Sequence, residues 1–65
     1  MNIINGKQAI KEALKANIYK IERILVNYNL KDKAEIQEIL NLAKTKNIKI
    51  QLKNKVELGI QAFIN

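Results

Sequence analysis

Residues 3–14 decide the fold of this chain, and they read Ile3-Ile4-Asn5-Gly6-Lys7-Gln8-Ala9-Ile10-Lys11-Glu12-Ala13-Leu14. A short apolar pair leads through Asn5 and Gly6 directly into a helical pattern. Gly6 stands at the corner, where the lack of a Cβ allows a tight turn and the close approach of a partner. We expect Asn5 to cap the helix and Gln8 to complete a capping box. The N–H groups of the first turn, with Lys7 beside them, would then suit a phosphate group.

The spacing of apolar residues predicts two helices and three further strands. The first helix is expected at residues 7–16 and the second after Asp32, which would cap it, with Glu35 in a capping-box position and Asn47 just past its end. The further strands are expected at residues 21–26, 48–53 and 60–64. The residues expected to be buried are Ala9, Ile10, Ala13 and Leu14 in the first helix, Ile36, Ile39, Leu40 and Ala43 in the second, and Ile24, Val26, Ile50 and Phe63 in the strands.

The order strand, helix, strand, helix, strand, strand indicates an α/β fold. Alternation of this kind is typical of a mainly parallel sheet with helices on its faces. The chain has 65 residues and no proline, repeat or polar linker that would divide it. We therefore expect a single domain over residues 1–65.

The charge of the chain points to a polyanionic partner. Twelve basic and six acidic side chains give a net charge of +6, and a cationic surface attracts nucleic acid through counterion release. The absence of cysteine fits a reducing compartment. No apolar run is long enough to cross a bilayer, and no secretory leader pattern is visible. We therefore expect a cytoplasmic protein without a membrane partner.

The residue types that the chain lacks exclude most catalytic sites. There is no His, Cys or Ser, and Thr45 is the only threonine, so nucleophile–histidine pairs and thiolate or imidazole metal sites cannot form. Gly6 and Gly59 are the only glycines, which excludes a P-loop and a dinucleotide-binding turn. The sequence therefore predicts no catalytic residues, no bound cofactor and no metal in this chain.

The opening segment resembles the N-terminal substrate-binding domain of SpoU-type (TrmH-like) RNA 2′-O-ribose methyltransferases. That domain begins with a short apolar strand, a glycine followed by a basic residue, a small residue followed by a β-branched one, and then Glu-Ala-Leu. The next strand, helix and strand match the family in order and spacing. The likeness covers residues 3–65 and is carried by Gly6-Lys7, Ala9-Ile10, Glu12-Ala13-Leu14, Ile24-Leu25-Val26, residues 36–43 and Ile48-Lys49-Ile50.

The resemblance implies a three-layer α/β/α sandwich with a small mixed sheet, as in kink-turn-binding ribosomal proteins. It also implies an RNA-binding accessory domain that orients ribosomal or transfer RNA for an S-adenosylmethionine-dependent enzyme. In the family, a separate knotted catalytic domain binds S-adenosylmethionine and transfers the methyl group, and we expect that domain to be absent from this chain. Enzyme activity, the cofactor and homodimerisation would then belong to the parent protein.

The turn chemistry and the resemblance give six candidate RNA-binding residues: Asn5, Gly6, Lys7, Gln8, Lys11 and Arg23. The alternative for the turn is an ordinary cap with a solvated lysine, and for Arg23 a salt bridge with a neighbouring glutamate rather than a bidentate phosphate contact. Five cations without an acid among them could follow a phosphate backbone or be solvated: Lys44, Lys46, Lys49, Lys53 and Lys55. Tyr19 and Tyr28 could stack on unpaired bases, although half-buried packing is the commoner fate of tyrosine. Glu35 and Glu38 are expected to lie on a solvated face.

Two other functions stay open at this point. One is a stand-alone kink-turn or ribosome-associated RNA-binding module without an enzyme, and the other is a protein-interaction domain with incidental charge. The chain also departs from the family near its last strand. Glu57-Leu58 stand before Gly59 where the family commonly has His-Gln, and the connection from Leu52 is short.

Overall fold

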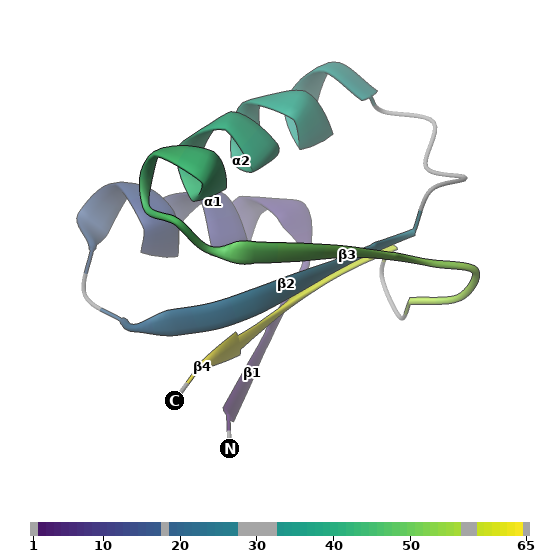
Figure 1. Cartoon of the computed structure of the whole chain (residues 1–65), viewed down its shortest axis with the longest axis horizontal. Helices are drawn as coiled ribbons and strands as arrows, with labels where there is room; N and C mark the ends of the chain where they lie inside the picture. Colours follow the sequence, from purple (N-terminus) through teal and green to yellow (C-terminus); the bar gives the residue numbers. More distant parts are fainter. Residues whose placement is uncertain (1, 18, 28–32, 57–58, 65) are drawn as a thin grey trace.

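The structure is a computed structural model that describes residues 2–17, 19–27, 33–56 and 59–64. The predicted order of strands and helices is confirmed (Figure 1). The elements are β1 (Asn2–Asn5), α1 (Lys7–Ala16), β2 (Ile21–Asn27), α2 (Lys33–Thr45), β3 (Lys49–Lys53) and β4 (Ile60–Ile64). No helix in these ranges has the length and apolar character needed to cross a membrane.

The four strands form one mixed sheet in the order β1-β4-β2-β3, which confirms the α/β fold and the small mixed sheet. Only β2 and β3 pair in parallel, whereas β4 runs antiparallel to both of its neighbours. Three of the four strands, β1, β2 and β3, therefore point in one direction, and β4 points in the opposite direction. The short connection at residues 54–59 leaves no room for the crossover that a parallel strand needs, so β4 runs in the opposite direction. It lies between β1 and β2.

Both helices lie on the same face of the sheet (Figure 1), so the described elements form two layers where three were expected. Because β1 and β2 are both antiparallel to β4, they are parallel to each other. The crossovers β1-α1-β2 and β2-α2-β3 thus advance in the same direction across the sheet. Right-handed crossovers that advance in one direction place their helices on one side. The opposite face of the sheet carries no described helix.

The core lies between the two helices and the sheet. Its largest fully buried side chains are Ile10, Leu14, Ile24, Ile39 and Ile60. The predicted burial of Ala13, Val26, Ile36 and Ala43 is also confirmed. The prediction is wrong for four residues, because Leu40, Ile50 and Phe63 are only half-buried and Ala9 is exposed.

The burial of β4 follows the two-residue period of a strand. Ile60, Ala62 and Ile64 are buried beneath the helices. Gln61 and Phe63 are half-buried and alternate with them. Phe63 therefore belongs to the opposite face of the sheet and not to the core.

The start of α1 differs from the predicted capping box. The N-cap is Gly6, with φ 91° and ψ 150°, and no side chain caps the helix. The side chain of Asn5 instead accepts a hydrogen bond from Nε2 of Gln61 at 2.7 Å. Asn47 has φ 59° after α2, as predicted for a C′ residue. The predicted cap Asp32 lies outside the described residues.

Candidate nucleic-acid interface

The sheet face that no described helix covers gathers polar, basic and aromatic side chains from all four strands. Strand register defines this open sheet face, because residues paired across neighbouring strands point to the same side. Arg23 pairs with Phe63 on one side and Lys49 on the other, and Phe63 pairs with Ile3. The ten paired positions on this face are Ile3, Asn5, Arg23, Leu25, Asn27, Lys49, Gln51, Lys53, Gln61 and Phe63.

Arg23 is held near the middle of the open sheet face. Its Cζ atom lies 4.2 Å from the centroid of the Phe63 ring, a distance at which the ring quadrupole attracts the guanidinium. Its Nη1 atom donates a hydrogen bond to Oε1 of Gln51 at 3.3 Å. Arg23 thus lies between an aromatic ring and an amide. The alternative, a salt bridge with a glutamate, is not found among the residues that the structure describes. A guanidinium has five N–H donors, and one bond to Gln51 leaves others for a ligand.

The open sheet face is positively charged. Arg23, Lys49 and Lys53 are on it, and none of its ten paired positions is acidic. The nearest acid along β2 is Glu22, which is exposed beside Arg23 at the register shift between Ile21 and Arg23. Arg23 and Lys49 stand directly opposite each other on β2 and β3. Like charges at paired positions repel, and an anion bound between them would relieve that repulsion.

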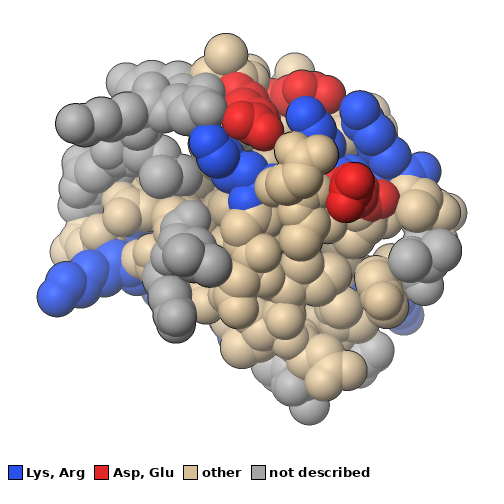
Figure 2. Space-filling view, turned by 180° about the vertical axis from the view of Figure 1, so that it is seen from behind, with Lys and Arg blue, Asp and Glu red and all other residues tan. Residues whose placement is uncertain are grey.

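The helical side of the molecule has a different charge pattern. A ladder of ion pairs joins α1 to α2: Lys7 lies 3.3 Å from Glu35, Lys11 lies 3.8 Å from both Glu35 and Glu38, and Lys15 lies 3.6 Å from Glu38. Figure 2 shows acidic and basic side chains intermixed over this part of the surface. Glu35 and Glu38 are therefore not simply solvated, as was expected, because they neutralise the lysines of α1.

The structure does not bring the six candidate RNA-binding residues together. Asn5 and Arg23 lie on the open sheet face, whereas Lys7 and Lys11 belong to the ion-pair ladder. The backbone N–H of Gly6 donates to the carbonyl of Ile60 at 3.1 Å, so it does not face an anion. Gln8 is exposed in the first turn of α1. The candidate residues therefore lie on two separate surfaces, the open sheet face and the start of α1.

Comparison with protein families identifies the chain. A family model described as RNA 2′-O ribose methyltransferase substrate binding matches residues 3–61. The chain belongs to this family. The match confirms the resemblance found in the sequence, and it makes the chain a domain of the type that binds RNA substrate in methyltransferases. Searches among curated proteins and among solved structures gave no match.

The fold separates the five cations that lie between residues 44 and 55 of this family domain. Lys49 and Lys53 lie on the open sheet face. Lys46 donates to Oδ1 of Asn17 at 3.1 Å, beside the end of α1, and Lys44 lies in the last turn of α2, where the helix dipole favours a cation. Lys55 is exposed in the connection to β4. The five residues therefore do not form one track for a phosphate backbone.

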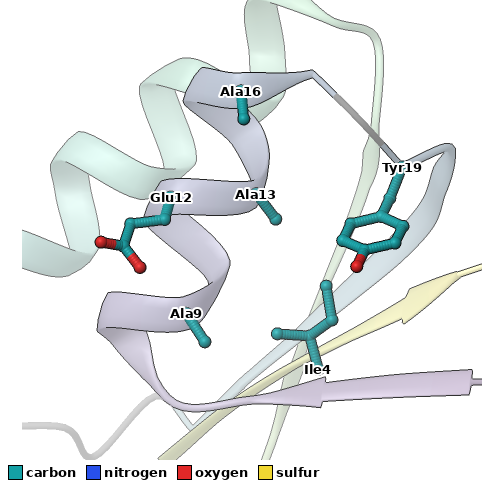
Figure 3. Close-up of a pocket in the computed structure, with 6 residues that line it drawn as sticks. All are labelled: Ile4, Ala9, Glu12, Ala13, Ala16 and Tyr19. Carbon is teal, nitrogen blue, oxygen red and sulfur yellow. The ribbon is translucent and has the colours of Figure 1, made fainter.

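A hollow of about 350 Å³ lies between α1 and the edge strand β1 (Figure 3). Its lining is apolar except for Glu12 and the hydroxyl of Tyr19, and in Figure 3 the carboxylate of Glu12 points away from Ile4 and Tyr19. Tyr19 is 50% exposed, with its ring beside Ile4 (Figure 3). The hollow has no cation for a phosphate group. Tyr28, the other candidate for stacking, lies outside the described residues.

Proposed function

We propose that this domain holds structured ribosomal or transfer RNA and orients it for a catalytic domain that methylates a ribose 2′-hydroxyl. Membership of the substrate-binding family supports RNA as the ligand. The observation that supports the open sheet face as the RNA-binding surface is that its paired positions include Arg23, Lys49 and Lys53 and no acidic residue. On this account the domain itself performs no chemistry.

The proposed action of the open sheet face is electrostatic positioning. When Lys49 and Lys53 contact phosphates of the RNA, the counterions of those phosphates are released. This release favours binding, whatever the RNA sequence. The fork of Arg23 can contact two phosphate oxygens at once, and its position is restrained by Phe63 and Gln51. Such backbone contacts fix the orientation of an RNA, and orientation is what a separate catalytic centre requires.

S-adenosylmethionine is proposed as the methyl donor of the catalytic domain and not as a ligand of this one. The described residues do not fit the cofactor, because the apolar hollow beside α1 provides no cation for its carboxylate and directs Glu12 outward. The residues Gly6, Lys7, Gln8 and Lys11 are proposed as a second, weaker RNA contact. A phosphate there has to compete with Glu35 for both lysines.

A titration of a fluorescently labelled ribosomal RNA hairpin tests the proposal. The double variant Lys49→Gln/Lys53→Gln should weaken binding and lower the slope of log K against log salt by about two. The double variant Lys44→Gln/Lys46→Gln is the matched control, since it removes the same charge outside the open sheet face. Equal losses in both variants would contradict the assigned surface. An affinity of the wild-type chain that does not change with salt would contradict RNA binding itself.

A further inference from the structure

We infer that the open sheet face binds an unpaired RNA base over the Arg23–Phe63 pair, an inference that rests on the proposed RNA-binding function. Phosphate contacts alone would need only the cations of this face. The structure places an aromatic ring and a planar guanidinium together among them, 4.2 Å apart. Attraction of phosphates by positive charge does not require an aromatic ring, so it does not account for the position of Phe63 beside Arg23.

The pair lies on the two central strands of the sheet. Phe63 is on β4 and Arg23 is on β2. The strand register places Ile3 of β1 beside Phe63 and Lys49 of β3 beside Arg23, so the four side chains form one row across the sheet. Neighbouring strands are about 4.8 Å apart, so a base over the middle of the row has an apolar side chain on one side and a cation on the other. Ile3 is 47% exposed, which leaves that apolar flank accessible.

The chemistry of the row matches a nucleobase. Every base has a π-face that stacks on aromatic rings or on the plane of an arginine, and such stacking requires the base to be unpaired and splayed out. The amides of Gln51 and Gln61 lie on the row beside this one, where they pair with Leu25 from either side. They offer donors and acceptors to the edge of a base, and Lys49 lies within reach of the phosphate next to it.

The competing possibility is that another protein, rather than RNA, covers the open sheet face. A protein partner would have to desolvate Arg23, Lys49 and Lys53, for which the paired positions of the open sheet face offer no acidic partner. Burial of unpaired charges is unfavourable. RNA supplies the missing negative charge together with a planar group, and the observations therefore favour RNA.

Two labelled oligonucleotides of equal length test the inference: oligouridine and its abasic ribose-phosphate analogue. They carry the same phosphates, so any preference for oligouridine reports contacts with bases. Wild type should bind oligouridine about 5- to 150-fold more tightly, the range expected for stacking of one base. Arg23→Lys keeps the charge but removes the plane, and it should weaken binding of oligouridine more than binding of the abasic strand, so that the preference is lost. Lys53→Gln is the control and should weaken both strands alike.

Phe63→Leu provides a second test, and circular dichroism establishes whether it folds. If it does not fold, Arg23→Lys decides the question. Equal, salt-dependent binding of both strands by wild type would overturn the base site while leaving RNA binding in place. Failure to bind either strand or the ribosomal hairpin would overturn both. NMR signals of Arg23 and Phe63 that shift with protein concentration, without RNA binding, would mean that a second copy covers the face and would also overturn the inference.

Discussion

The ammonium nitrogen of Lys7 in α1 lies 3.3 Å from a carboxylate oxygen of Glu35 in α2. Glu35 also lies 3.8 Å from Lys11, so one carboxylate serves two lysines that the sequence marked for RNA. About a third of each side chain of the Lys7–Glu35 pair is exposed, 32% and 29%, so solvent screens the interaction only in part. The lysines of α1 therefore approach RNA with a counter-charge already beside them.

Removal of that counter-charge should strengthen RNA binding. In Glu35→Gln, Lys7 and Lys11 lose a carboxylate partner, and the affinity for an RNA hairpin should rise at low salt and depend more steeply on salt. Stability should fall by no more than about 1 kcal/mol, the usual range for partly exposed ion pairs. Glu12→Gln makes the same change in net charge at a residue of α1 that has no ion pair among the described residues. Anisotropy titrations that show equal gains for the two variants would refute a specific role for Glu35.

The neighbouring residues Ile39 and Leu40 should differ in their effect on stability. Ile39 is fully buried, whereas Leu40 is half-buried. Truncation of a buried isoleucine to alanine removes apolar contacts and leaves a cavity, so Ile39→Ala should lower the free energy of unfolding by about 2–5 kcal/mol. Leu40→Ala should lower it less. Urea unfolding followed by circular dichroism measures both, and a larger loss for Leu40→Ala would show that the face of α2 toward the sheet has been assigned wrongly.

Gly6→Ala should destabilise the domain through backbone conformation alone. At φ 91° and ψ 150° Gly6 occupies a region that is essentially restricted to glycine, yet an added Cβ would meet no atom within 4 Å. The expected loss is about 1–3 kcal/mol. Asn47→Gly is the control, because φ 59° is a left-handed conformation that glycine adopts readily. The conformation assigned to Gly6 would be wrong if its alanine variant unfolded at the same urea concentration as wild type.

The chain alone should show no saturable heat of binding when S-adenosylmethionine is added in a calorimeter. The sequence has no glycine-rich cofactor turn, and the hollow beside α1 is apolar. Saturable heats with a defined stoichiometry would contradict the proposal that the cofactor belongs to another domain.

The elements of this fold could be predicted from the sequence because their signals are local. The apolar spacing of residues 36–43 gave the buried face of α2, and the alternation of residues 48–53 gave β3. The place of β4 could not be predicted, because antiparallel insertion between β1 and β2 depends on pairing between residues far apart in the chain. The sequence also does not reveal that both helices lie on one face, since that follows from strand order.

The candidate site was predicted less well for the same reason. Arg23 and Phe63 are 40 residues apart, and only the register of β2 with β4 brings them together. A signal was present in Ile60-Gln61-Ala62-Phe63-Ile64, where Phe63 has the phase of the polar Gln61 rather than that of the isoleucines. The pairing of Lys7 with Glu35 had no such signal, because it depends on how α1 packs against α2.

The central claim is that RNA binds the open sheet face, and an NMR titration of the isotope-labelled chain with an RNA hairpin that carries unpaired loop bases tests it most directly. We predict that the largest shifts appear at Arg23, Lys49, Gln51 and Phe63, with smaller ones at Lys7 and Lys11. Shifts confined to α1 and α2, with Arg23 and Phe63 unchanged at saturation, would contradict it.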